Sequence, residues 1–283
     1  MQYRFFPLFD TLENHVSINS NVVFTLKKTS SEIADEYEKL FLYLKNYVGS
    51  GDTFNTYRRE VERFFHWSWT IKKISIFKLT PLDIGDYIKF CRTPPASWCM
   101  PKQLKRFILK DGIRCPNSMW KPFITGSSLS DNSLQILLAA LGTMYTYCQQ
   151  EGYLERNPVQ LMRQKTRLIR KKHTVRVTRK LTKTQWNLVI NTAHKLANQN
   201  KKYERHLFLL SAFFLMGVRI SELSVTSKHA PLMQHFFKDQ HDCVWFSTVG
   251  KGYKYREIAV CDAMLDALYR YRNSLGLNRF PNI

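Results

Sequence analysis

In this 283-residue chain, the residues whose types and spacing most strongly indicate chemistry on a bound anion are Arg219 and Glu222. Arg219 follows Gly217 directly after the apolar run LFLLSAFFLM, so we expect a turn that brings a guanidinium close to a buried helix. Burying a guanidinium is unfavourable unless an anion meets it. Glu222 lies three residues further along the same helical face and could be that anion. A bound phosphate is the other candidate.

Lys251 is the second cation in an unusual position. It lies between Gly250 and Gly252 in the turn VGKGYK, which joins the segments CVWFST and YREIAV. The alternation of apolar and polar residues in these segments predicts two β-strands, and the glycines allow a close approach to a ligand. An ammonium group on such a turn can donate a proton. Taken alone, Lys251 could also be an ordinary turn lysine.

The charge of the chain indicates a polyanionic partner. Its 43 Lys and Arg residues outnumber its 22 Asp and Glu residues, which gives a formal net charge of +21. This excess favours nucleic acid or an anionic membrane surface as partner. A protein that is merely basic is the alternative.

A basic linker divides the chain. No Asp or Glu occurs between Arg156 and Tyr203, and the densest part is RQKTRLIRKKHTVRVTRK, residues 163–180. We predict that this linker lies along DNA phosphates, the alternative being a solvated linker. The residues that we expect to contact DNA are Arg163, Lys165, Arg167, Arg170, Lys171, Lys172, Arg176 and Arg179, with Lys254 and Arg256 of the hairpin.

Other classes of protein are disfavoured. No apolar run approaches the roughly 20 residues that a membrane span requires, and Asp10 and Glu13 interrupt the opening where a signal peptide is apolar. We therefore expect a cytoplasmic protein, associated with the nucleoid of a bacterium, with no membrane partner. The six cysteines form no Cys-x-x-Cys pair, which favours free thiols. A zinc site would have to use Cys91, Cys99, Cys115 and His66, and we predict neither a metal nor a cofactor.

The first 165 residues show the apolar periodicity of helices. We predict helices within residues 31–48, 52–69, 80–90 and 130–151, and a short one from Pro158. Asp52 and Thr80 are expected caps, and Gly49 and Gly152 expected ends. Residues 92–128 contain five prolines and no periodicity, which indicates a long ordered insertion or a surface loop. Residues 1–30 carry no motif and are assigned to an N-terminal extension.

The region after the linker predicts a mixed α and β domain. Thr182 and Gln185 fit a capping box at its first helix, and we expect Asp262 to cap its last helix and Gly276 to end it. The predicted fold class is mainly α with a small β-hairpin or sheet. An all-α domain at 31–165 is followed by the linker at 166–180 and a partial α+β domain at 181–283.

Several segments resemble the tyrosine recombinase, or phage integrase, family. The segment MGVRISELSV resembles the family's first-arginine box, Gly-x-Arg-x-x-Glu-Leu, and VGKGYKYREIAV resembles its lysine hairpin. Upstream, TYRREVERFFHWSW, LTPLDIGDYIKF and EGYLERNPVQLM resemble its helical core-binding domain, and RKLTKTQWNLVI the entry to its catalytic domain. The resemblance covers about residues 31–275, with 92–128 outside the pattern.

The resemblance implies a site-specific recombinase or integrase of a mobile element, which breaks and rejoins DNA through a phosphotyrosine without a cofactor. Arg219 would grip the scissile phosphate, Lys251 would protonate the departing 5′ oxygen, and Glu222 would support Arg219. The implied partner is double-stranded DNA, on which the family self-associates as a tetramer.

The sequence departs from the family after the hairpin. The family's His-x-x-Arg box and nucleophilic tyrosine are not found among the 32 residues that follow Lys251. The segment HTVR, residues 173–176, precedes Arg219 and does not fit that box, and we expect Tyr269 and Tyr271 to lie on the surface or in the core of a helix. We therefore expect a C-terminally incomplete recombinase that cannot cleave DNA alone. A non-cleaving DNA-binding remnant or accessory protein is the alternative; a helical transcription regulator explains Arg219 and Lys251 less well.

Overall fold

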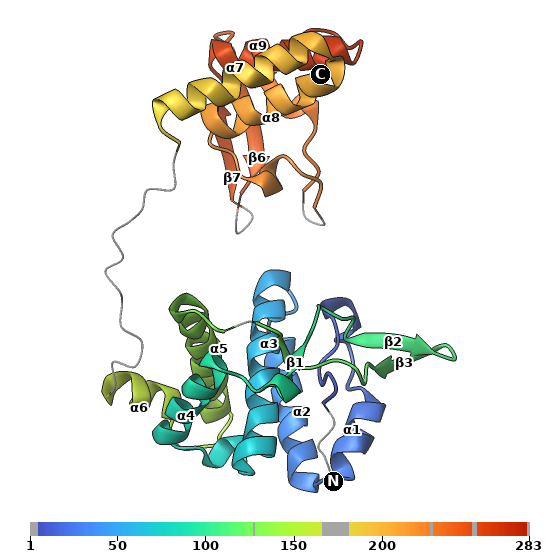
Figure 1. Ribbon diagram of the computed structural model, residues 1–283, viewed down its shortest axis with the longest axis vertical. Helices are drawn as coiled ribbons and strands as arrows, with labels where there is room; N and C mark the ends of the chain where they lie inside the picture. The colour runs from blue at the N-terminus through green and yellow to red at the C-terminus, as the bar shows by residue number, and fades with distance from the viewer. Residues whose placement is uncertain (1–4, 127, 166–180, 227–228, 251–253, 282–283) are drawn as a thin grey trace. The chain divides into compact units, whose positions relative to one another are not determined.

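The computed structural model describes residues 5–126, 128–165, 181–226, 229–250 and 254–281, with 163–165 described by backbone alone. The chain divides into two compact units, residues 1–173 and 174–283. Over the described ranges there are nine α-helices and three small sheets, two of two strands and one of three (Figure 1). The predicted fold class, mainly helical with a small amount of β-structure, is confirmed at that level.

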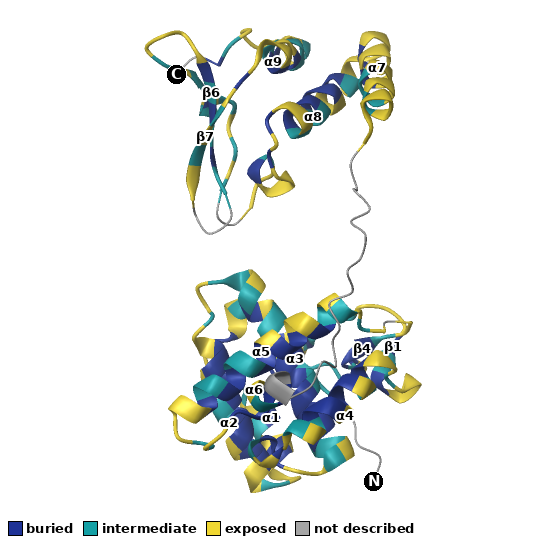
Figure 2. Cartoon of the chain, turned by 90° about the vertical axis from the view of Figure 1, so that its left-hand side faces the viewer, coloured by how far each residue is buried: buried dark blue, intermediate teal, exposed yellow. Residues whose placement is uncertain are grey.

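The first unit is a helical body around one core. Its helices are α1 (Ser20–Lys27), α2 (Ser31–Lys45), α3 (Gly51–Trp67), α4 (Pro81–Arg92), α5 (Asp131–Gln150) and α6 (Pro158–Lys165). The helix α3 packs against both α2 and α5, and Leu40, Phe64 and Leu141 from these three helices are fully buried. Figure 2 shows the buried faces of the helices turned toward one another.

Local capping explains where several helices begin. Thr80 caps α4 as predicted, with Pro81 at the first helical position, and its side chain and Asp83 also form a capping box. Asp52, however, lies in the first turn of α3, because the carbonyl of Ser50 already accepts the N–H of Phe54 at 2.8 Å. An acidic residue is favoured at the cap and in the first turn alike, so composition alone does not distinguish the two positions.

Two other predicted helix ends were wrong by a few residues. The helix predicted within 31–48 ends at Lys45, and the chain continues in turns to Gly49, with the N–H of Tyr47 bonded to the carbonyl of Leu44. Asp262 is the first residue of the last helix and Cys261 is its N-cap. Gly152 and Gly276 have positive φ values of 75° and 73° and follow helix ends as predicted.

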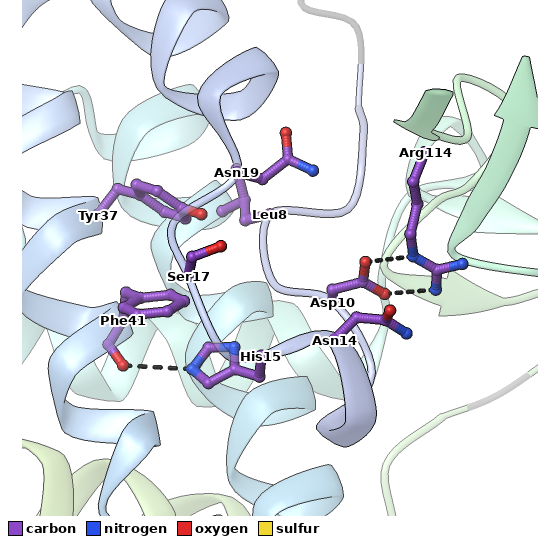
Figure 3. Close-up of a pocket in the computed structure, with 9 residues that line it drawn as sticks. All are labelled: Leu8, Asp10, Asn14, His15, Ser17, Asn19, Tyr37, Phe41 and Arg114. Atoms are coloured by element: carbon purple, nitrogen blue, oxygen red, sulfur yellow. Dashed lines mark hydrogen bonds and ion pairs between the residues drawn. The ribbon is translucent and has the colours of Figure 1, made fainter. Parts of the chain in front are cut away.

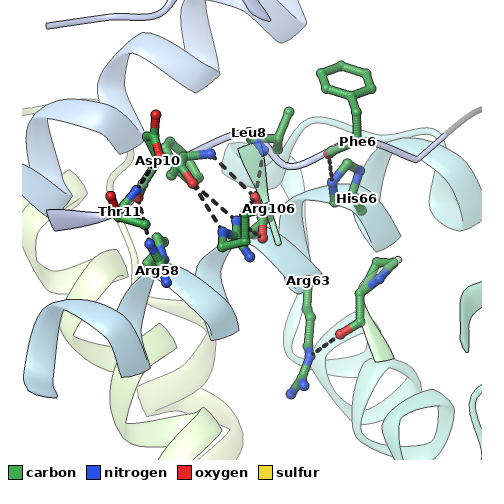
Figure 4. A network of polar contacts seen from close by, with 11 residues as sticks. Phe6, Leu8, Asp10, Thr11, Arg58, Arg63, His66 and Arg106 are labelled. Atoms are coloured by element: carbon green, nitrogen blue, oxygen red, sulfur yellow. Dashed lines mark hydrogen bonds and ion pairs between the residues drawn. The ribbon is translucent and has the colours of Figure 1, made fainter. Parts of the chain in front are cut away.

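Residues 5–30, in which the sequence showed no motif, contribute to the first core. Leu8 and Phe9 are buried, and their N–H groups donate to Oε1 of Glu62 at 2.6 and 3.3 Å. The carbonyl of Phe6 lies 3.1 Å from Nε2 of His66, and Arg58 donates to the carbonyl of Asp10 at 2.6 Å (Figure 4). Side chains of α3 therefore hold the backbone of this segment.

The described residues of the segment at 92–128 include two pairs of short strands. It contains the parallel pair β1 (Cys99–Met100) and β4 (Phe123–Ile124) and the antiparallel pair β2 (Phe107–Lys110) and β3 (Ile113–Pro116). Trp98, Phe107, Trp120 and Phe123 are buried in it. The description of the first domain as all-α was wrong here, because strands of two to four residues are too short to show a period.

The second unit packs three helices with a small sheet. The helices are α7 (Lys183–Gln199), α8 (Glu204–Leu215) and α9 (Asp262–Ser274). The antiparallel sheet has the order β5 (Phe236–Lys238), β6 (Val244–Val249), β7 (Tyr255–Ala259). The predicted capping box of Thr182 and Gln185 and the two strands of the hairpin are confirmed. Phe208, Phe246 and Met264 lie in the core of this unit.

None of the helices in the described part of the chain is long and apolar enough to cross a membrane. The six cysteines are free thiols, as predicted.

Candidate anion-binding site

A glycine turn at the end of α8 sets up the candidate site. Gly217 has a φ of +61°, a conformation that favours glycine, and it reverses the direction of the chain after Met216. Val218 then enters the core, and Arg219 is extended, with φ −84° and ψ 156°. A single 3₁₀ turn, Ile220–Glu222, returns the side chain of Glu222 toward Arg219.

Glu222 is the centre of the site. Its side chain is 1% exposed. Its Oε2 accepts the N–H of Arg219 at 2.7 Å and Nη2 of Arg256 at 2.5 Å, and its Oε1 accepts Nη1 of Arg219 at 2.9 Å. Burial alone would raise the pKa of Glu222, but the hydrogen bonds from the Arg219 backbone and from the Arg256 and Arg219 guanidinium groups outweigh it, so the pKa lies below its usual range.

The exposure of Arg219 is the opposite of what we expected from the sequence. Its side chain is 59% exposed, so the buried charge is the carboxylate and not the guanidinium. The reason is that the C-terminal end of α8 is less buried than its composition suggests, since Phe214 and Leu215 are exposed. Arg219 and Glu222 do pair, and the pair points a cation toward solvent.

The hairpin brings a second arginine to Glu222. Arg256 lies on β7 opposite Thr248 of β6, and its side chain is 37% exposed. Gly250, at the end of β6, closes the turn by donating its N–H to the carbonyl of Lys254 at 2.8 Å. A Cβ at position 250 would lie 3.2 Å from Oε1 of Glu222 and 3.5 Å from Nη1 of Arg219. The absence of a side chain at Gly250 therefore lets the base of the hairpin contact the ion pair.

Most of the other predicted site residues lie outside the described part of the chain. This holds for Lys251 and for the linker residues Arg167, Arg170, Lys171, Lys172, Arg176 and Arg179. Arg163 and Lys165 lie at the end of α6, where the side chains are not described. Lys254 is exposed directly after the turn. The described contacts thus bring together Arg219, Glu222 and Arg256.

The two tyrosines of α9 are used in packing. The ring of Tyr271 stacks on Phe208 at 5.1 Å between centroids and belongs to the edge of the second core. The ring of Tyr269 lies 4.5 Å beneath the guanidinium of Arg279. Both contacts agree with the expectation that these residues lie on the surface or in the core of a helix.

The zinc site that was considered does not form in the described part of the chain, where no group of three or more His, Cys, Asp or Glu side chains could hold a metal ion. Cys91 is buried in α4, and burial raises its pKa to about 12. His66 faces the carbonyl of Phe6.

The arrangement of the described residues can bind an anion. Two guanidinium groups share one carboxylate, which leaves a net positive charge, and an arginine fork can grip two phosphate oxygens. Sequence reasoning placed Arg256 among DNA contacts but missed its bond to Glu222. The register of the hairpin is what would have indicated this bond. It places Arg256 opposite Thr248, and Thr248 lies two residues before Gly250.

Comparisons with known proteins find no family model that matches the chain and no curated protein that matches it significantly.

Proposed function

We propose that this chain binds double-stranded DNA and that its second unit grips a backbone phosphate with Arg219, in the manner of the tyrosine recombinases that its sequence resembles. The observation that carries the proposal is the ion-paired but exposed guanidinium of Arg219. Oε1 of Glu222 accepts a hydrogen bond from Nη1 of Arg219 at 2.9 Å. Within the described residues, no other hydrogen bond of the Arg219 side chain is found. A guanidinium has five N–H donors, so the remaining ones can meet a phosphate while Glu222 fixes the orientation.

Charge supports the same proposal. The net charge of +21 and the acid-free stretch from Arg156 to Tyr203 favour a phosphate backbone as partner. Lys251, which follows Gly250 in the sequence and lies outside the described residues, is proposed as the proton donor to the departing oxygen. Self-association on DNA belongs to the same proposal, as does a site without a cofactor.

A second candidate is a DNA-binding accessory protein that does not cut. It is favoured by the packing of Tyr269 under Arg279 and of Tyr271 on Phe208, because both rings are engaged in packing contacts. In that case the chain occupies recombination sites, and any strand cleavage there needs a tyrosine other than Tyr269 and Tyr271.

Salt titration of duplex binding tests the phosphate site. If about eight phosphates are contacted, log K falls with log salt at a slope near −7, from roughly −0.9 per phosphate. Arg219→Ala is expected to weaken binding about 3–30-fold and to reduce the slope by about one.

Arg270→Ala is the matched control for this titration. Arg270 is also an arginine paired with a largely buried carboxylate, but its Nε and Nη2 are already bonded to Glu204 and Asn198. Its replacement should leave the slope unchanged. An affinity for duplex DNA that does not depend on salt, or equal effects of the two substitutions, would refute the phosphate site.

A nicked suicide duplex tests whether the chain itself can cut DNA. The duplex carries sequences enriched by the chain itself from a random pool, and products are run on a denaturing gel. We expect no covalent protein–DNA band. A band that is lost in Tyr269→Phe or in Tyr271→Phe would show that these residues cut DNA and would reject the accessory role.

A further inference from the structure

The antiparallel pair β2–β3, residues 107–116 (the ribbon), lies in the insertion that the family resemblance does not cover. In Figure 1 its two arrows extend away from the helices of the first unit. The turn Asp111–Gly112 has φ values of +51° and +77°, which suit a tight two-residue connection. The ribbon is therefore a projecting element whose role the site described above leaves unexplained.

The ribbon is held to the first unit at its base and along one face. Phe107 is buried, and Arg114 binds both carboxylate oxygens of Asp10, at 2.5 and 2.7 Å (Figure 3). Just before the ribbon, Arg106 donates to Glu62 at 2.5 Å and its guanidinium lies 4.8 Å from the ring centre of Trp120. An element anchored in this way is presented in one orientation, which lowers the entropy lost on binding.

The tip of the ribbon combines apolar and basic side chains. Leu109 is 71% exposed and Ile113 is 60% exposed. Leu109 lies opposite Arg114 and Ile113 opposite Lys110, so the two apolar side chains lie on opposite faces of the ribbon. Exposed side chains of this size lose apolar contact with water when a partner covers them, which favours binding.

Charge identifies the kind of partner. Residues 99–126 contain six basic residues and one acidic residue, Asp111. Arg106 and Arg114 are paired with carboxylates of the first unit, whereas Lys102, Lys105 and Lys110 are exposed and form no ion pair within the described residues. Exposed lysines at the tip (Lys110) and before the base (Lys102 and Lys105), together with the exposed apolar side chains, fit a surface that is anionic at its edges and apolar in places between them.

We infer that the ribbon docks in the major groove of duplex DNA with the face that carries Ile113 and Lys110 toward the base edges, Ile113 against a thymine methyl group and the lysines against the flanking phosphates. The major groove, about 12 Å wide, admits a two-stranded ribbon, and the thymine methyl group is its main apolar feature. The inference rests on the proposed binding of duplex DNA and adds to it a contribution of the insertion to the choice of sequence.

The test begins with duplexes enriched from a random pool by the full chain. The selected duplex is synthesised with thymine and with deoxyuridine, which lacks only the methyl group, and both are titrated with three proteins. These are the parent chain, the double variant Leu109→Ser with Ile113→Ser, and the control Leu82→Ser, which replaces an exposed leucine of α4. Thermal unfolding checks that all three fold alike.

The parent chain and Leu82→Ser are expected to bind the thymine duplex about 3–10-fold more tightly than the deoxyuridine duplex. The double variant is expected to bind both equally. If the parent binds DNA but enriches no sequence, or ignores the methyl group, or if the double variant keeps the preference, the inference is wrong while the proposed function stands.

Two other outcomes would also overturn it. A parent chain that binds no duplex at low salt would refute the proposed function and this inference together. A double variant that binds both duplexes like the parent, but loses self-association in sedimentation, would assign the ribbon to contacts between protein copies.

Discussion

Both units bury a carboxylate against arginines, but they use the arginines differently. In the first unit, Glu62 meets Arg106, which is 11% exposed and donates to Glu62 and to the carbonyl of Phe9. In the second unit, Glu222 meets Arg219, which is largely exposed. The same kind of ion pair, between an arginine and a buried glutamate, thus joins two protein segments in one unit and holds a cation toward solvent in the other. The exposure of the guanidinium, more than the presence of the pair, distinguishes a structural role from a binding role.

Among the substitutions that compare the two pairs, Glu62→Gln is expected to lower the free energy of unfolding the most. It leaves Arg106 without its charged partner inside the core, and loss of one member of a buried pair typically costs about 3–5 kcal/mol. Calorimetry of the intact chain should show the loss in the unfolding of the first unit. Glu32→Gln, which touches only an exposed pair with Lys78, should change the free energy of unfolding by less than about 1 kcal/mol.

Glu36 sharpens the comparison, because it is a buried carboxylate that accepts hydrogen bonds from Ser75, Trp69 and Ile76 and forms no ion pair among the described residues. Burial raises its pKa from 4.5 to about 7. Between these values the folded state holds a proton that the unfolded state has lost, so the free energy of unfolding falls as pH rises from about 4.5 to 7, by on the order of 3 kcal/mol.

Glu36→Gln should remove this part of the pH dependence. Urea unfolding of both proteins at pH 5 and at pH 8 measures it. A parent chain whose first unit is equally stable at the two values would show that Glu36 stays ionised in the fold.

Glu222→Gln is expected to have a smaller effect than Glu62→Gln. Arg219 and Arg256 are both partly exposed and can be solvated when the carboxylate is lost, so we expect a loss of about 1–2 kcal/mol, localised to the second unit by hydrogen exchange. The lowered pKa of Glu222 means that its contribution is complete above about 4.5 and is lost as pH falls through the folded value. Parent and variant should therefore converge in acid.

Arg219→Ala should have the smallest effect on stability, within about 1 kcal/mol, because its guanidinium is largely in water. Arg106→Ala, with a buried guanidinium, should cost several times more. If the two substitutions destabilise equally, the distinction between the two pairs is not one of exposure, and Arg219 would be a structural residue.

The sequence predicted those features that depend on neighbouring residues. The cap at Thr80 and the capping box at Thr182 involve residues at most three positions apart, and the hairpin of β6 and β7 follows from short-range alternation. The pairing of Arg219 with Glu222 follows from the same short spacing.

Features that depend on distant contacts could not be predicted in the same way. The bond from Arg256 to Glu222 spans 34 positions and requires both the turn at Gly217 and the register of the hairpin. The strand β5 has three residues, too few to show a period. The exposure of Arg219 depends on which neighbours cover α8, and an apolar composition does not reveal that.

The attachments of the N-terminal segment have a consequence for how the first unit is made. Leu8 is held by Glu62, the carbonyl of Phe9 by Arg106 and the carboxylate of Asp10 by Arg114, separations of 54, 97 and 104 positions. Contacts so distant in sequence raise the contact order and are slow to form, since long loops must close first. During synthesis, residues 8–10 leave the ribosome 54 to 104 residues before these partners. Although it is translated before its partners, this segment is thus expected to reach its native place among the last parts of the first unit.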